Sequence, residues 1–363
     1  MQTQGRRYLY KVVYDALKNE ILDESYTNGM LLPSEREISI RFDVDRTTVR
    51  KALEMLVAEN LVEKRAGVGT CVTYKHSYQA QTPLSNNKII GFFIVEDATV
   101  DKKIAQPFYS DLFYHVENQC KKHEANLIYS TIHRPEDLVA LISSQKFSGI
   151  IFASKADKTY VEIAENHGIK TAQILGYSSQ GLTIRYDSAT AGKIAINHLV
   201  EKGHQNIAFI TGPRDFGASS DRIMGVLSAM YAHGLSVKKN QIFEGNWEYE
   251  GGYDCAKKIL ALEKGITAIY SFNDMMAIGA IQAITDAGLK VPEDISIIGN
   301  DNMSKIRPNK QLLTTVDSNV SVLASIAIDY FFDDNVHYMN GTKIIIPVTF
   351  VEGDTVKDLR TPE

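Results

Sequence analysis

Cysteine is scarce in this chain of 363 residues, and long apolar runs are missing. The three cysteines are far apart and odd in number, which favours free thiols in a reducing cytoplasm over a disulfide framework. No apolar segment approaches the roughly 18 residues of a membrane-spanning helix, and the N-terminus lacks the apolar centre of a signal peptide. We therefore expect a cytoplasmic protein without membrane contact.

Motifs for catalysis are also lacking. There is no Gly-x-Gly-x-x-Gly after the first expected α/β strand, no Walker loop and no Gly-x-Ser-x-Gly elbow. The nine histidines are scattered without the spacing of metal ligands. We expect no catalytic residues, no metal and no cofactor apart from a small-molecule effector. An enzyme is the minority interpretation, which detectable turnover of a bound ligand would revive.

The charge of the chain is not broadly basic in any part. The net charge is −5, and residues 1–76 carry 12 basic and 11 acidic side chains. Basic side chains do gather locally in that segment: Arg36, Arg41, Arg46, Arg50, Lys51, Lys64 and Arg65. This clustering is a weak indication of nucleic-acid binding by itself.

Three helices are expected near the N-terminus. Apolar residues recur at helical spacing over 8–24, where one side is expected to hold Val12, Val13, Ala16, Leu17 and Ile21. Ser34 and Glu37 form a capping box for a short helix over 35–42. Asp45 is a suitable N-cap for a third helix, whose apolar stripe is expected to contain Val49, Leu53, Leu56 and Val57.

Two short strands, LVEKR and TCV, follow the third helix and are joined by a glycine turn. Three helices and a hairpin predict a winged helix-turn-helix over 1–73, whose third helix enters the major groove. Arg46 and Arg50 share one face of that helix, and Thr47 and Thr48 project from its first turn. These side chains suit phosphates and base edges, although alone the pattern also fits a solvated surface helix.

The same segment resembles a known family of DNA-binding domains. The run LLPSEREISIRFDVDRTTVRKALEMLVAENLVEKRAGVGTCV is similar to the GntR-type domain, over roughly sixty residues. Cys71 replaces the usual aromatic residue after the wing threonine, and Asp45 replaces a frequent serine. By this resemblance six residues would contact DNA: Arg36, Arg46, Thr47, Thr48, Arg50 and Gly67.

Residues 74–87 are polar and aperiodic, and they are predicted to be a linker. From 88 to 363, continuous apolar strands alternate with helices. Strands are expected at KIIGFFIV, ANLIYSTI, SGIIFAS, KTAQIL, NIAFITG, near 240, AIYSF and ISIIG, and helices at 108–124, 135–144, 159–167, 188–202, 219–233, 249–263 and 275–287. This alternation predicts an α/β fold with two doubly wound parallel-sheet lobes, which bind ligands where the carboxyl ends of their strands face one another.

Four polar or aromatic residues stand near expected strand ends in the second lobe. Asp301 and Asn273 follow strands, Trp247 lies in EGNWEYEGG, and Arg222 lies in a helix whose expected inner side holds Ile223, Val226, Leu227 and Met230. Each has a structural alternative: a turn aspartate, a helix cap, a core tryptophan and a surface arginine. Together they match the usual contacts of a neutral sugar, with hydrogen bonds to hydroxyls and stacking on the CH face.

A second resemblance supports that interpretation. The segments NHLVEKGHQNIAFITGP, SSDRIMGVLSAM, IYSFNDMMAIGAIQAITDAGLKVPEDISIIGNDN and LLTTV resemble the effector-binding core of LacI/GalR-type repressors, which is of periplasmic-binding-protein type. The resemblance covers about 88–352 and implies that the effector contacts Phe108, Arg222, Trp247, Asn273 and Asp301. Asn300 departs from the family's usual aromatic residue, and VEGDTV lacks the usual arginine. The combination of the two domain types is similar to that of arabinose repressors of Gram-positive bacteria.

We therefore expect a cytoplasmic, carbohydrate-responsive repressor that binds double-stranded operator DNA as a homodimer. Two alternatives remain open: a regulator with an effector other than a sugar, and a sugar-binding protein without regulatory coupling. The winged helix weighs against the second. The sequence does not identify the sugar or the operator.

Overall fold

The computed structural model describes residues 6–22, 26, 29–59, 61–65, 69–73, 88–96, 103–154, 156–177, 180–262, 265–303, 311–333 and 338–360. The chain divides into two compact units, Met1–Asn86 and Asn87–Glu363. The predicted linker over 74–87 lies outside the described residues, so the domain limits at 73 and 88 stay predictions. Among the described residues, no helix is both long enough and apolar enough to cross a membrane.

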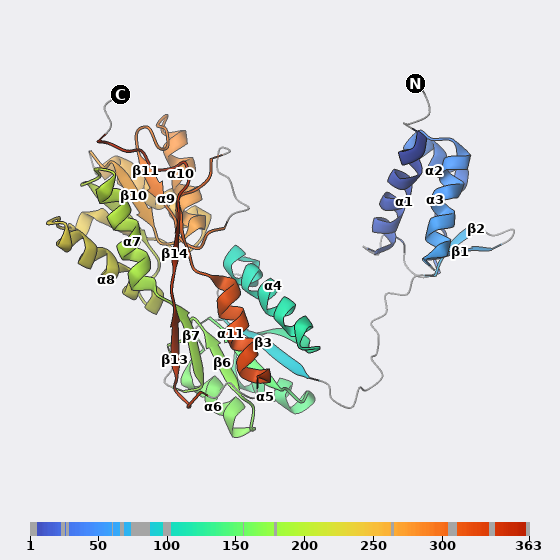
Figure 1. Ribbon diagram of the computed structural model, residues 1–363, viewed down its shortest axis with the longest axis horizontal. Coiled ribbons are helices and arrows are strands. Elements are labelled where there is room, and N and C mark those ends of the chain that lie inside the picture. The colour runs from blue at the N-terminus through green and yellow to red at the C-terminus, as the bar shows by residue number, and fades with distance from the viewer. Residues whose placement is uncertain are drawn as a thin grey trace. The chain divides into compact units, whose positions relative to one another are not determined.

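The described residues of the N-terminal unit form three helices followed by a two-stranded antiparallel hairpin, as Figure 1 shows. The elements are α1 (Arg6–Leu22), α2 (Glu35–Phe42), α3 (Arg46–Ala58), β1 (Val62–Arg65) and β2 (Gly69–Val72). The capping box of Ser34 and Glu37 begins α2, and the Asp45 side chain caps α3. The predicted winged helix-turn-helix is confirmed.

The core of this unit is narrower than the sequence predicts. Val13, Leu17 and Ile21 of α1 pack with Ile38 of α2 and with Val49, Leu53 and Leu56 of α3. Two predicted core residues are wrong, because Val12 is 56% exposed and Val57 is 37% exposed. Each neighbours a buried residue in sequence, and one residue turns a helix by about 100°, which carries these valines past the edge of the stripe.

The first lobe has a six-stranded parallel sheet in the order β13-β7-β6-β5-β3-β4. Its strands are β3 (Ile89–Val95), β4 (Asn126–Ile132), β5 (Gly149–Ala153), β6 (Thr171–Ile174), β7 (Leu182–Tyr186) and β13 (Lys343–Ile346). One apolar cluster joins the sheet to α4 (Pro107–Lys122) and α11 (Val320–Phe332), and another joins it to α5 (Pro135–Ser144) and α6 (Lys158–Asn166). The sheet is therefore covered on both faces, as Figure 1 shows.

The second lobe has a four-stranded parallel sheet in the order β11-β10-β8-β9. Its strands are β8 (Ile207–Thr211), β9 (Ile242–Glu244), β10 (Ala268–Ser271) and β11 (Ser296–Ile298). Its helices are α7 (Ser188–Glu201), α8 (Gly217–Ala232), α9 (Tyr249–Leu262) and α10 (Asp274–Asp286), which share one large core with the sheet. The predicted α/β fold class with two parallel-sheet lobes is confirmed.

Within the part of the chain that the structure describes, the chain passes between the lobes three times, which the sequence did not predict. It leaves β7 for α7, returns from β12 (Thr315–Asp317) to α11, and leaves β13 for β14 (Thr349–Val351). The Asp187 N–H donates to the Ile346 carbonyl at 2.9 Å, and Asn319 Nδ2 donates to the Pro347 carbonyl at 2.8 Å. The three crossing segments therefore lie together and can act as one hinge.

Candidate effector and DNA-binding sites

The five predicted effector residues all follow carboxyl ends of parallel strands. Phe108 lies in α4 after β3, Arg222 in α8 after β8, Trp247 after β9, Asn273 after β10 and Asp301 after β11. The two lobes are in contact at these ends, because Gln106 Nε2 before α4 donates a hydrogen bond to Glu248 Oε1 beside Trp247. We call this region the inter-lobe site.

Arg222 is buried, at 1% exposure, so the alternative of a surface arginine is wrong. Its NH1 donates to the Phe272 carbonyl and its NH2 to the Tyr186 hydroxyl at 2.9 Å, while Nε is buried without a partner among the described residues. The inner side of α8 holds Arg222 with Val226 and Met230, whereas the predicted Leu227 is 38% exposed and Ile223 is only partly buried. A buried donor without an acceptor is a group that a ligand can satisfy.

A close helix contact explains this orientation. An added Cβ would lie 2.4 Å from the Arg222 carbonyl oxygen at Gly192 and 1.9 Å from the Ala189 oxygen at Gly225. The backbones of α7 and α8 therefore touch at these glycines, which turns Arg222 inward. The guanidinium carbon then lies 5.5 Å from the centre of the Phe272 ring and 5.7 Å from that of Tyr186.

Asp301 presents a partly satisfied carboxylate. Its Oδ1 accepts from Asn300 Nδ2 at 2.9 Å and from the Ser318 hydroxyl at 3.1 Å, and no described residue donates to Oδ2. Its φ of 115° lies in a region that residues other than glycine seldom adopt, a form of strain common at binding sites. Burial raises the pKa of Asp301 to about 7, against the opposing effect of Arg222.

Asp274 was not predicted as a site residue. It is 2% exposed, and it accepts from the Thr315 hydroxyl at 2.6 Å and from the Met303 N–H at 2.7 Å. Burial raises its pKa to about 6. Because these bonds attach the segment around Asp301 to β12, Asp274 is a positioning residue for Asp301. Only a tertiary contact reveals this role.

Asn273 and Trp247 are joined by a hydrogen bond. Asn273 Oδ1 accepts from the Met276 N–H at 2.9 Å, so the helix-cap alternative is correct, and Nδ2 donates to the Trp247 carbonyl at 2.8 Å. Trp247 has a φ of 73°, and its indole N–H is buried without a partner among the described residues. An added Cβ at Gly212 would lie 1.9 Å from the indole, so this glycine lets the ring pack against the backbone.

The first lobe contributes aromatic side chains to the same region. Phe108 is partly buried and packs edge-on against Tyr109, with 5.4 Å between ring centres. Tyr109 is buried, and burial raises its pKa to about 12. Tyr186, which holds Arg222, and Gln106, which reaches Glu248, were not predicted. No local sequence pattern distinguishes these two residues from ordinary core and surface positions.

The predicted DNA-binding residues of α3 lie on its solvent side. Arg46, Thr47 and Arg50 are exposed, and Thr48 is partly exposed. Arg50 Nε donates to Glu35 of α2 at 2.8 Å. Lys64 of β1 lies 3.9 Å from the same carboxylate. The Glu35 carboxylate therefore links the first turn of α2 to the middle of α3 and to strand β1 of the hairpin.

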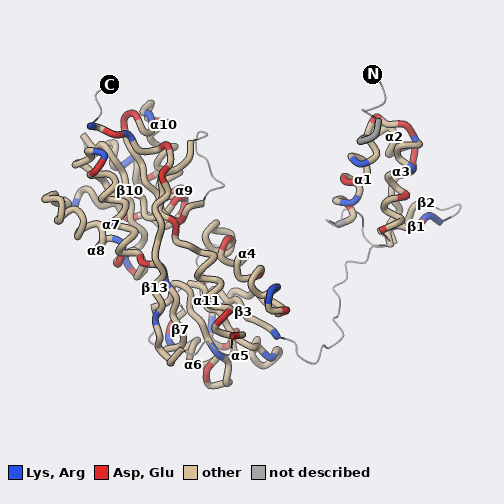
Figure 2. The backbone as a smooth tube through the Cα atoms, in the orientation of Figure 1, with Lys and Arg blue, Asp and Glu red and all other residues tan. Residues whose placement is uncertain are grey.

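Of the two remaining predicted DNA contacts, the structure describes only one. Arg36 is exposed on α2, and Gly67 lies outside the described residues. Figure 2 shows both signs of charge on this unit, in agreement with its nearly balanced composition. DNA recognition would therefore depend on local arginine geometry rather than on a broad basic surface.

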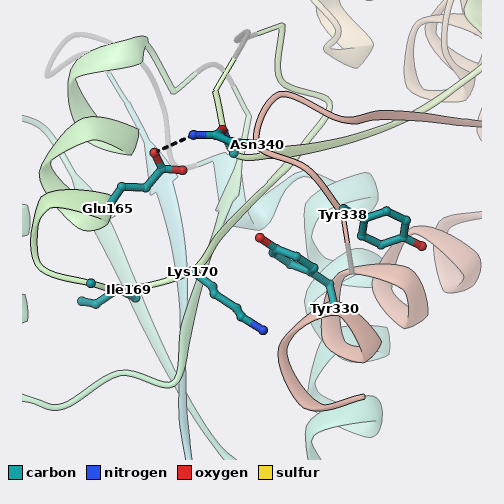
Figure 3. Close-up of a pocket in the computed structure, with 8 residues that line it drawn as sticks. Glu165, Ile169, Lys170, Tyr330, Tyr338 and Asn340 are labelled. Atoms are coloured by element: carbon teal, nitrogen blue, oxygen red, sulfur yellow. Dashed lines mark hydrogen bonds between the residues drawn. The ribbon is translucent and has the colours of Figure 1, made fainter. Parts of the chain in front are cut away.

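A separate pocket of about 300 Å³ lies on the first lobe, where its strands begin. Figure 3 shows Tyr330 and Tyr338 on one side of it and the hydrogen-bonded pair Glu165 and Asn340 on the other. The Lys170 ammonium is 5.4 Å from the Tyr330 ring centre. None of the predicted effector residues lines this pocket.

Comparison with known families agrees with the two-unit architecture. Residues 95–352 match the family described as periplasmic binding proteins and sugar binding domain of LacI family. The chain belongs to the LacI family. Residues 9–72 match bacterial regulatory proteins of the gntR family, so a GntR-type DNA-binding domain precedes the LacI-type core. The narrower resemblance to arabinose repressors stays a prediction.

Curated relatives of this LacI-family chain are transcriptional regulators. The transcriptional repressor PurR of Vibrio campbellii is 29% identical over 284 residues, covering 75% of this chain and 83% of the relative. PurR of Histophilus somni strain 129Pt is 30% identical over 234 residues, covering 62% and 70%. The chain is accordingly a transcriptional repressor of the LacI family with its own DNA-binding domain.

Known structures share the fold. The lac repressor dimer bound to operator and an anti-inducer has a TM-score of 0.65 at 21% identity, over 75% of this chain and 95% of that one. A LacI-family regulator from Enterococcus faecium with bound ribose has a TM-score of 0.64 at 24% identity, over 75% and 100%. A CelR–cellobiose complex has a TM-score of 0.65 at 17% identity, over 89% and 100%.

Proposed function

We propose that this LacI-family chain is a carbohydrate-responsive, cytoplasmic repressor that binds operator DNA as a homodimer and is released by a small sugar. The observation that carries the proposal is the inter-lobe site. There, a carboxylate oxygen of Asp301, the Nε of Arg222 and the indole N–H of Trp247 have no partner among the described residues. These groups come from separate segments of one lobe and are held by buried hydrogen bonds.

A sugar can supply hydrogen-bonding partners for these three groups. Its hydroxyls can donate to Asp301 Oδ2 and accept from Arg222, and the CH face of its ring can lie against the Trp247 indole. Ribose and cellobiose bound to proteins of this fold support that choice of ligand. A planar ligand could also stack on Trp247 and Phe108, but it would leave the unpaired oxygen of Asp301 with fewer donors.

DNA binding as a dimer is supported by the lac repressor dimer seen on its operator. One winged helix contacts a single half-site, so two copies would read an operator with two-fold character.

A thermal-shift screen of the full chain tests the effector class. Monosaccharides, disaccharides, sugar phosphates and nucleobases should be compared at equal concentration. A ligand at about 100 times its dissociation constant adds about 2.7 kcal/mol of stability. We expect a neutral sugar to raise the melting temperature and change the fluorescence of the single tryptophan. A response to nucleobases alone would replace the sugar by another effector.

We expect the effector and operator affinities to be reciprocally coupled. Two sites on one molecule must change each other's binding free energy by the same amount, typically about 1–3 kcal/mol. A saturating sugar should therefore weaken operator binding about 5–150-fold, measured by titrating labelled operator with and without the sugar. Unchanged operator affinity would identify a sugar-binding protein without regulatory coupling, and tighter binding would indicate a co-repressor.

Effector affinity should fall in mild acid. Hydroxyl donors prefer the ionised carboxylate, and Asp301 has a pKa of about 7, so protons compete with the sugar as the pH falls. At pH 6 about one-tenth of Asp301 would be ionised, which weakens apparent affinity about tenfold relative to pH 8. Calorimetry at both pH values measures this. Asp301→Asn should abolish the dependence. Asp274→Asn should move it to lower pH, because the charge of Asp274 helps to raise the pKa of Asp301. A flat profile in the unaltered chain would remove Asp301 from the contact.

A further inference from the structure

Acidic groups outnumber basic groups around the inter-lobe site among the described residues. Asp274 and Asp301 lie in the second lobe, where the charge of Asp274 raises the pKa of Asp301, and Glu96 of the first lobe is 6% exposed. The basic groups are Arg222 and Lys103. Glu96 of the first lobe and Asp301 of the second both act on Tyr109, because the charge of each raises the pKa of its hydroxyl.

Both cations already donate to protein oxygens. Arg222 uses NH1 and NH2 for Phe272 and Tyr186. The Lys103 ammonium donates to the Val95 carbonyl at 3.0 Å and to the Ser154 hydroxyl at 3.1 Å. Among the described residues, a phosphate, which needs many donors and positive charge, would therefore find mainly two buried donors without a partner, the Nε of Arg222 and the neutral indole N–H of Trp247.

We propose that the effector is an uncharged carbohydrate and that Asp274, buried beside Asp301, excludes phosphorylated and carboxylated forms of the same sugar. This inference rests on the proposed function and names the ligand class of its site. A like charge placed near a buried carboxylate is strongly unfavourable, because little water is present to screen it. Neutral hydroxyls meet no such barrier.

The role of the Asp274 charge can be tested with a substitution that keeps a side chain of the same shape. In Asp274→Asn the side-chain oxygen can still accept from the Met303 N–H, and the new NH2 can donate to the Thr315 hydroxyl. The negative charge is removed while the shape and both contacts remain. Glu201→Gln is the matched control, because Glu201 is exposed at the end of α7, at the edge of the lobe away from the strand ends.

The experiment compares each sugar with its charged derivatives by calorimetry on the full chain at pH 8. The probes are arabinose, ribose, glucose and cellobiose, with arabinose 5-phosphate, ribose 5-phosphate, glucose 6-phosphate and glucuronate. Glucuronate separates charge from size, because its carboxylate adds little volume. We expect the preferred sugar to bind at least about a hundredfold more tightly than its anionic derivative. Asp274→Asn should reduce that ratio about tenfold, and Glu201→Gln should leave it unchanged.

The outcomes separate this inference from the function on which it rests. A phosphate or uronate that binds as tightly as the neutral sugar would overturn the inference and leave a carbohydrate-responsive repressor. An unchanged ratio in a folded Asp274→Asn variant would overturn the role of Asp274. If that variant does not fold, the ratio between the preferred sugar and its anionic derivative in the unaltered chain decides whether charged forms are excluded. Binding of no carbohydrate, neutral or charged, would overturn the proposed function as well.

Discussion

Replacing Asp301 by alanine is expected to weaken sugar binding at least about tenfold while the variant still binds operator DNA. Hydrogen bonds to a charged acceptor contribute about 1.5–3 kcal/mol, and the free Oδ2 of Asp301 is placed to accept them. The effect should be large because the carboxylate is fixed before the ligand arrives, by Asn300 and Ser318 on Oδ1 and by Asp274 through the neighbouring segment. A rigid acceptor loses little entropy on binding.

Tryptophan fluorescence provides the measurement. Trp247 is the only tryptophan, and its carbonyl is held by Asn273, so its signal reports on this site alone. Titration with the responding sugar should saturate in the unaltered chain and fail to saturate over the same range in Asp301→Ala. Glu201→Ala serves as a control for loss of an acidic side chain. Full sugar affinity in Asp301→Ala, with a thermal shift but no tryptophan response, would place the effector elsewhere.

The positions of the site residues follow from one property of parallel sheets. The carboxyl ends of parallel strands share an edge, so polar residues directly after apolar strands must meet there. Asn273 and Asp301 could therefore be placed together from the sequence. Helix limits were also close, since the predicted 135–144 is α5, Pro135–Ser144. Helix limits of this kind can be predicted from the sequence because proline and apolar periodicity act within a single helix.

Features that depend on tertiary pairing could not be predicted in this way. The inward orientation of Arg222 depends on the glycine contact between α7 and α8, and the role of Asp274 depends on Thr315 and Met303. Helix α11 was also missed. Its run VSVLASIAIDYFF is apolar on most sides and lacks the clear stripe of an amphipathic helix, although it packs against the first-lobe sheet and α4.

We expect Arg46→Ala and Arg50→Ala each to weaken operator binding by about 1–3 kcal/mol if the arginine holds a base edge. Both side chains are exposed on one face of α3, and Asp45 fixes the first turn by accepting from the Thr48 N–H at 2.8 Å. Arg46 has no ion pair among the described residues. Arg50 is paired with Glu35, an exposed pair that contributes little stability and can exchange for a DNA contact.

Titration of labelled operator and of an unrelated duplex, at several salt concentrations, distinguishes the two kinds of contact. Loss of a base contact should reduce affinity for the operator more than for the unrelated duplex. Loss of a phosphate contact should reduce affinity for both duplexes. It should also lower the slope of log affinity against log salt concentration by about one unit. Lys51→Ala is the matched control from the same helix, because its ammonium lies 4.2 Å from the Tyr10 ring centre on α1, away from the Arg46 face. Full operator affinity in both arginine variants would exclude α3 as the recognition helix.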